Sequence, residues 1–151
     1  MTTHHPPRLT AQLDQLTAAS TDAYRRLAHL GASHDSPVHL GPIPPWLVPH
    51  LRHLAHALAS GTARRCPHLG TAPAVAHAAV WDPGHLTCAR CTHRLTPSPG
   101  EDTTCDRCRQ QADPIYPGAI ALGPILLTFG LCPRCLAHTE PTTASRKGNR
   151  P

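Results

Sequence analysis

Apolar residues recur at helical spacing over the first thirty residues of the chain. Between Arg8 and Leu30 they fall alternately four and three positions apart, with Ser20 filling one slot, and Gly31 follows. This pattern predicts a helix with a narrow apolar stripe that ends at the glycine. The stripe consists of Leu9, Leu13, Leu16, Ala23, Leu27 and Leu30.

A second helix is predicted over 45–60. Its leucines repeat the same spacing, proline stands at its first position, and Gly61 follows its end. The proline-rich segment 32–45 reads as a linker between the helices. Neither stripe is wide enough for a helix buried on its own. We therefore expect the stripes to face each other or to cover the rest of the protein, in preference to self-association of helix 8–30 through its three heptads.

Strand-like patterns occur in the C-terminal half. Two β-prone runs, 119–122 and 125–129, flank Gly123-Pro124 and predict a hairpin. A looser version occurs upstream, where 78–81 and 85–87 flank the turn-forming residues 82–84. Trp81, beside that turn, is expected to plug the core of this unit.

The composition limits how much of the fold burial can support. The chain has 18 Pro, 10 Gly and only 3% aromatic residues, so a single large core is not expected. Seven Cys in 151 residues suggest another source of stability. The N-terminus lacks a basic region followed by an apolar run, and the apolar stretch 118–131 is too short to cross a bilayer, so we expect a cytoplasmic protein without membrane contact. In that compartment, paired cysteines indicate metal ligands or redox centres before disulfides.

The cysteines form three Cys-x-x-Cys pairs and one single residue, which stands in the sequence Cys66-Pro-His68. Two intervening residues fold the chain into a tight knuckle, so both sulfurs face one ion. Counting His68 gives eight ligands, which is the number that two tetrahedral zinc sites require. The expected cofactor is therefore two Zn²⁺ per chain. The ligands are Cys66, His68, Cys88, Cys91, Cys105, Cys108, Cys132 and Cys135.

A knuckle, a hairpin and a cysteine pair that opens a helix follow one another twice over residues 66–138. This order resembles the treble-clef class of zinc fingers at the level of overall shape. The sequences Leu86-Thr-Cys-Ala-Arg-Cys and Gly130-Leu-Cys-Pro-Arg-Cys also read as an internal repeat. We therefore pair Cys66, His68, Cys88 and Cys91 as site 1, and Cys105, Cys108, Cys132 and Cys135 as site 2.

Other arrangements stay open at this point. Cys88, Cys91, Cys105 and Cys108 could form a zinc ribbon, which leaves the outer ligands to share the other ion. With Cys66 and His68 counted as the first of four ligand pairs, a RING-like brace would instead join the first with the third and the second with the fourth, although loop closure favours near partners. One zinc with a separate redox pair, or one iron–sulfur cluster, would use the same cysteines. Three nearby histidines could be substitute ligands, but we expect each at the surface or packed beside the ligands. The three on the second helix could be read as a metal face, but we expect them to be solvated. In that order, the two sets are His85, His93 and His138, and His50, His53 and His56.

The ligand count argues against catalysis. A catalytic zinc keeps an open position for water, whereas three Cys with one His, and four Cys, close both shells. The His-x-Glu arrangement of zinc deaminases does not occur. A zinc-finger-type nuclease is a weaker alternative, because only His85 and His93 resemble the histidines that such a nuclease requires.

Charge offers a second interpretation. The formal charge of +5 and the pI of about 9.1 suggest nucleic acid. Counting ligating cysteines as thiolates with two zinc ions lowers the charge to about +2, most of it in the tail 139–151. We expect the arginines within and beside the knuckles to offset thiolate charge, with phosphate binding as the alternative. These are Arg64, Arg65, Arg90, Arg107 and Arg134, with Arg146, Lys147 and Arg150 in the tail.

The predicted protein is thus a small, metal-stabilised α+β chain: an N-terminal helical pair followed by two zinc-knuckle and β-hairpin units. Its expected segments are a helical part over 1–61, a double zinc-binding module over 62–138 and a basic disordered tail over 139–151. We expect a non-enzymatic protein-interaction or regulatory adaptor, with a DNA- or RNA-binding zinc finger as the competing interpretation.

Overall fold

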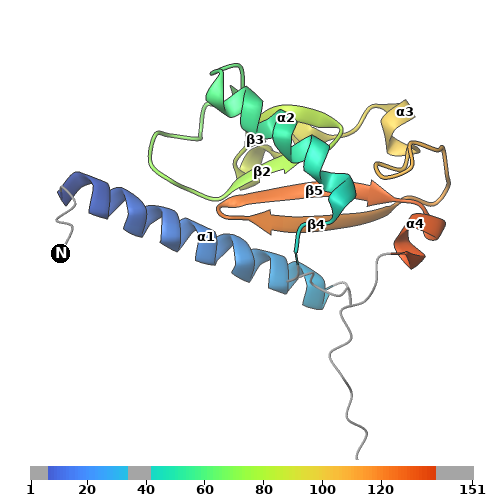
Figure 1. The fold of residues 1–151 in the computed structure, drawn as a ribbon, viewed down its shortest axis with the longest axis horizontal. Coiled ribbons are helices and arrows are strands. Elements are labelled where there is room, and N and C mark those ends of the chain that lie inside the picture. Colours follow the sequence, from blue (N-terminus) through green and yellow to red (C-terminus); the bar gives the residue numbers. More distant parts are fainter. Residues whose placement is uncertain (1–6, 34–41, 139–151) are drawn as a thin grey trace, which may run out of the picture.

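The computed structural model describes residues 7–33 and 42–138, which form a small α+β fold around one sheet (Figure 1). The N-terminal elements are α1 (Pro7–Ser33), the 3₁₀ turn η1 (Pro45–Leu47) and α2 (Val48–Ala59). The strands are β1 (Arg64–Arg65), β2 (Ala76–Ala79), β3 (Asp82–Thr87), β4 (Tyr116–Leu122) and β5 (Ile125–Leu131). Between and after them come η2 (Ala89–Leu95), α3 (Pro99–Asp102) and α4 (Pro133–Ala137).

The five strands lie in the order β1-β3-β2-β5-β4. Two antiparallel hairpins, β2–β3 and β4–β5, stand side by side because β2 pairs with β5 in parallel, from Ala76 opposite Ile125 to Ala79 opposite Thr128. The short β1 adds to β3 in parallel at one edge. The two units predicted from the sequence repeat therefore share one continuous sheet.

One face of the sheet is covered by η1 and α2. Leu47 and Leu54 are buried there against Ala78, Leu86 and Leu127. The Trp46 indole meets the Phe129 ring edge-on, with centroids 5.2 Å apart and planes at 87°. The predicted stripe of the second helix therefore covers the strands of the cysteine-bearing half.

The opposite face carries α1 along β4 and β5. Ala23 and Leu27 are buried against Val75, Ala121 and Leu126. The two N-terminal helices thus lie on opposite faces of the sheet and do not pack stripe to stripe (Figure 1). Both predicted helices are present, but α1 runs from Pro7 through Gly31 to Ser33, so the predicted stop at the glycine is wrong. The predicted second helix begins as the 3₁₀ turn η1 before it continues as α2.

The N-terminal half of α1 reaches past the β4–β5 turn (Figure 1). Ser20 of α1 lies opposite this turn, because a Cβ added at Gly123 would lie 3.6 Å from the Ser20 hydroxyl. The contact between α1 and the sheet therefore ends near Ser20. Beyond that point the predicted stripe is exposed: Leu9, Leu13 and Leu16 keep 39%, 47% and 41% of their surface. We call residues 7–17 the α1 overhang.

The upstream hairpin turns earlier than the sequence predicts. The turn lies at Val80–Trp81, and 82–84 belong to β3. Gly84 has φ +77°, and a Cβ there would lie 3.0 Å from the Cβ of Ala57. We expected Gly84 to form the hairpin turn. Instead, it allows β3 to bend and α2 to approach the strand closely.

The predicted tail 139–151 and most of the linker 32–45 lie outside the described residues. The boundary between the 1–61 and 62–138 segments stays a prediction. Within the described ranges, no helix combines the length and apolarity that spanning a membrane requires.

Candidate metal centres

The first cysteine cluster gathers at one end of β3. Cys66 directly follows β1, and His68 lies in the turn after it. Cys88 directly follows β3, and Cys91 lies in the first turn of η2. The four potential ligand atoms all lie within 4.8 Å of one another. Parallel pairing of β1 with β3 explains the meeting, because it sets the residues after both strands beside each other.

Backbone and side-chain contacts already hold this cluster together. The Cys88 amide donates a hydrogen bond to the Cys66 sulfur at 3.2 Å, and the Cys66 amide donates to the Leu86 carbonyl at 3.0 Å. The Nδ1 of His68 lies 3.2 Å from the Cys91 sulfur. Both buried thiols, Cys66 and Cys91, face inward, while His68 is exposed on one side.

The thiols of this cluster differ in acidity. Burial acts to raise the pKa of Cys66, but amides of Cys88 and His68 outweigh it and lower the pKa to about 7. Burial, followed by hydrogen bonding to Cys88, raises the pKa of Cys91. Cys66 is thus the more easily ionised of these two thiols, which favours attraction of a cation, while Cys91 holds its proton more tightly.

The second cluster repeats this arrangement at one end of β5. Cys105 and Cys108 lie in a tight turn after α3, Cys132 caps the N-terminus of α4, and Cys135 lies in its first turn. Again the four sulfurs lie within 4.8 Å of one another. The Cys135 amide donates to the Cys132 sulfur at 3.4 Å. A short helix that begins on a Cys-x-x-Cys pair is thus common to the second unit and, in 3₁₀ form, to the first.

The same contrast of acidity recurs in the second cluster. Against the effect of burial, the amides of Cys108, Cys132 and Arg107 lower the pKa of Cys105 to about 6. Burial and hydrogen bonding to neighbouring thiols raise the pKa of Cys135 to about 12. Each cluster therefore contains one thiol with a lowered pKa and one with a raised pKa.

The donor sets fit tetrahedral zinc. A Zn–S bond of about 2.3 Å places the corners of a tetrahedron about 3.8 Å apart. The sulfurs of Cys108 and Cys132 lie 3.9 Å apart, which is close to that spacing and far beyond the ~2.05 Å of a disulfide. All seven cysteines are free thiols. Soft sulfur ligands with one imidazole suit zinc better than a hard cation such as Mg²⁺.

The geometry groups the eight residues as consecutive pairs, which is the sequential arrangement. Cys66 and His68 lie with Cys88 and Cys91, as predicted for site 1. Cys105 and Cys108 lie with Cys132 and Cys135, as predicted for site 2. The substitute ligands stand apart: His85 bonds through Nδ1 to Asp82 at 2.8 Å, and His93 and His138 are exposed. Of the helix histidines, His50 lies edge-on to Trp46 with ring centroids 6.3 Å apart, while His53 and His56 are exposed. Metal ligation itself stays a prediction.

The arginines divide into two groups. Arg107 donates to the Cys135 carbonyl at 3.3 Å, so it packs against the second cluster. Arg64 is ion-paired with Asp82. Arg65, Arg90 and Arg134 are exposed, and none has an ion pair within the described ranges.

Sequence reasoning missed Asp106, a buried carboxylate inside the second knuckle. It is 3% exposed and accepts a hydrogen bond from the Gly130 amide at 2.6 Å, while its own amide donates to the Gly130 carbonyl at 2.9 Å. These two bonds tie the knuckle to β5. A polar residue between two cysteines gave no signal, because such positions are ordinarily solvated.

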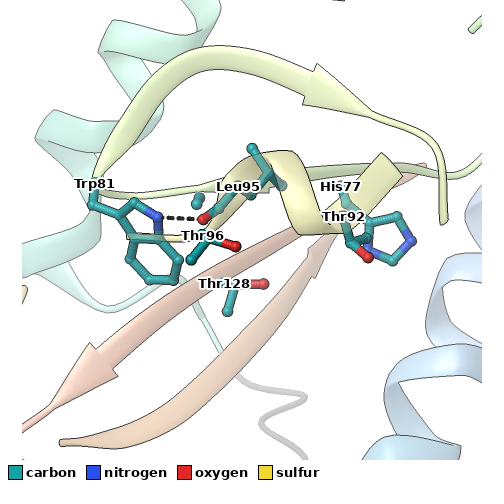
Figure 2. A pocket seen from close by; sticks show the side chains of 7 residues that line it. His77, Trp81, Thr92, Leu95, Thr96 and Thr128 are labelled. Carbon is teal, nitrogen blue, oxygen red and sulfur yellow. Dashed lines mark hydrogen bonds between the residues drawn. The ribbon is translucent and has the colours of Figure 1, made fainter. Parts of the chain in front are cut away.

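Trp81 plays a more specific part than the predicted core plug. Its indole N–H donates to the Leu95 carbonyl at 2.6 Å, which anchors the end of η2 beside the first cluster (Figure 2). The ring is half-buried and forms one end of a small cavity of about 220 Å³ on the α1 side of the sheet. His77 forms the other end, and Thr92, Thr96 and Thr128 lie between them (Figure 2).

Comparison with protein families, curated proteins and solved structures gave no match. The function of this chain must therefore be inferred from its own geometry.

Proposed function

We propose that this chain is a non-enzymatic protein-interaction or regulatory adaptor whose fold is held by two structural zinc ions. The observation that supports it is the pair of four-ligand clusters, each drawn from a knuckle and a Cys-x-x-Cys pair. A fully occupied protein shell leaves no position for a reactive water, so such a metal stabilises structure and does not activate a substrate. We extend the proposal to a treble-clef-like shape for each unit, with two such units fused through one sheet.

Metal content and unfolding test this proposal. The purified, reduced protein is expected to contain two zinc ions per chain and to melt cooperatively. After chelation it is expected to lose that melting transition, and added zinc should restore it, because metal binding supplies folding free energy at such sites. Zinc near one per chain, or cooperative melting after complete demetallation, would contradict the proposal. Magnesium added in place of zinc is the control.

Nucleic-acid binding is the second candidate function. The exposed Arg65, Arg90 and Arg134 support it, since they have no ion pair within the described residues. The engagement of Arg107 with the Cys135 carbonyl and of Arg64 with Asp82 leaves fewer free cations than the sequence suggests. Phosphate binding weakens steeply as salt rises, so retention on DNA or RNA that vanishes between about 50 and about 200 mM salt would favour this candidate.

Self-association through the α1 overhang is a separate proposal. The stripe that buries Ala23 and Leu27 on the chain's own sheet continues through three exposed leucines, and a second copy would cover them. Sedimentation at rising concentration should then show a dimer that Leu13→Glu removes. A monomer up to high concentration would exclude it.

A further inference from the structure

A groove of about 620 Å³ lies beside the second metal cluster. One wall is α3 and the residues after it, the opposite wall is the segment 112–117, and β5 supplies Phe129 and Gly130. The remaining apolar surface comes from Trp81, Ile115 and three prolines. This size is typical of sites that take a drug-sized ligand or several side chains, and larger than a single ion needs.

The groove is acidic in a basic protein. The chain has 14 Lys and Arg against 9 Asp and Glu, yet four of those nine carboxylates line this groove, and no Lys, Arg or His is among the described residues that line it. The four are Glu101, Asp102, Asp106 and Asp113.

One nearby cation offsets part of this charge. Arg109 bonds to both oxygens of Glu101, at 2.8 and 3.2 Å, and lies 3.5 Å from Asp106. Asp102 and Asp113 are exposed and have no ion pair within the described ranges. Asp102 and Asp113 therefore remain as two exposed carboxylates at the groove without a neighbouring cation among the described residues.

Aromatic faces complement the carboxylates. Trp81 and Phe129 are both half-buried, and the hydrogen bond from Trp81 to the Leu95 carbonyl fixes the indole in place. A guanidinium or ammonium group over an indole face gains cation–π attraction, and its aliphatic stem covers apolar surface. Two exposed carboxylates together with aromatic and proline surface in one groove match the charged end and the apolar stem of an Arg or Lys side chain.

We propose that this groove binds an extended, Lys- and Arg-bearing segment of a partner protein. The proposal rests on the proposed function as an interaction protein and specifies its surface and the chemistry of its partner. Nucleic acid is disfavoured at this surface because its phosphates would meet unpaired carboxylates. None of Arg65, Arg90 and Arg134 is among the described residues that line the groove.

The test uses the zinc-loaded full chain and a blocked peptide that alternates alanine with lysine and arginine. Binding is followed by tryptophan fluorescence, to which Trp46 and Trp81 both contribute, and by amide NMR shifts at Thr103, Thr104 and Gly130. We expect saturable binding that weakens as salt rises, with those three amides among the most shifted. A peptide of the same length with glutamine at every basic position should bind at least about tenfold more weakly, because it lacks the charges.

Matched double variants test the groove itself. Asp102→Asn with Asp113→Asn is expected to weaken the basic peptide about tenfold, since each partly exposed ion pair contributes up to about a factor of five. Asp14→Asn with Asp22→Asn changes the net charge equally on α1 and should leave affinity within about twofold. A tail variant with glutamine at 146, 147 and 150 should bind as the unaltered chain does.

Four results would overturn the proposal: no binding by the unaltered chain, equal binding of the glutamine peptide, equal losses in both double variants, or much tighter binding by the tail variant. The last would identify the chain's own C-terminal segment as the occupant. Zinc content and melting of every variant are measured alongside. Two zinc ions with no peptide binding would reject the groove alone, whereas absence of zinc would reject the proposed function.

Discussion

The contact of α1 with the sheet can be measured with one truncation. Leu27 is 4% exposed and packs in a cluster made largely of small residues, including Ala23 and Ala121. These neighbouring side chains are short and are held on a regular helix and sheet, so they cannot move far enough to fill the cavity that Leu27→Ala would leave. Leucine-to-alanine changes in cores cost about 2–5 kcal/mol, and a persistent cavity places this one at about 3–4 kcal/mol or above.

Leu13→Ala is the matched control, because Leu13 lies on the same helix face in the overhang and is 47% exposed. We expect it to change the free energy of unfolding by less than about 0.5 kcal/mol. Urea denaturation of zinc-loaded protein at low micromolar concentration, followed by circular dichroism, measures both. Equal effects of the two truncations would refute the docking of α1 through Leu27. Amide exchange then distinguishes loss of α1 alone from global unfolding, since only the latter breaks the pairing of Leu126 and Leu127 with β2 and β4.

Three further predictions concern the two cysteine clusters and a half-buried histidine. Cys132→Ser should unfold the C-terminal unit, seen as loss of dispersed amide signals, and retained dispersion would contradict a structural site. Arg107→Ala should lower zinc-dependent stability by about 1 kcal/mol, more than it lowers nucleic-acid retention, whereas Arg134→Ala should not lower stability. Burial, with a smaller effect of Arg26, lowers the pKa of His77 below its usual 6.5. The unfolded chain therefore takes up the proton first, so the stability advantage of the unaltered chain over His77→Gln should shrink as pH falls below about 6.5. A constant difference between pH 7.5 and 5.5, within about 0.3 kcal/mol, would contradict this.

Local chemistry was predictable from the sequence where it depends on spacing. Two residues between cysteines, and a proline just after Cys66, fix the knuckles without help from the rest of the chain. The leucine spacing similarly predicts both helices. The sequence repeat between 86–91 and 130–135 pointed to the grouping that the geometry shows.

Long-range pairing was not predictable in the same way. No residue of β2 or β5 signals that the two strands pair in parallel, because both are simply apolar on their buried faces. Gly84 looks like a turn residue, and only the position of Ala57 reveals that it allows a helix to approach. The exposure of Leu13 likewise follows from where the β4–β5 turn ends, which is a property of the sheet and not of the helix.

The parallel pairing of β2 with β5 has a consequence for how the two proposed zinc sites would be loaded. On the proposed function, zinc in each cluster orders the adjoining hairpin, and an ordered hairpin offers its neighbour an edge to pair with. Loading either cluster therefore prepares the other, and the second ion binds to a chain whose ordering is already partly complete. At limiting zinc the population should divide into empty and doubly loaded molecules, so native mass spectrometry should find few chains that carry a single ion.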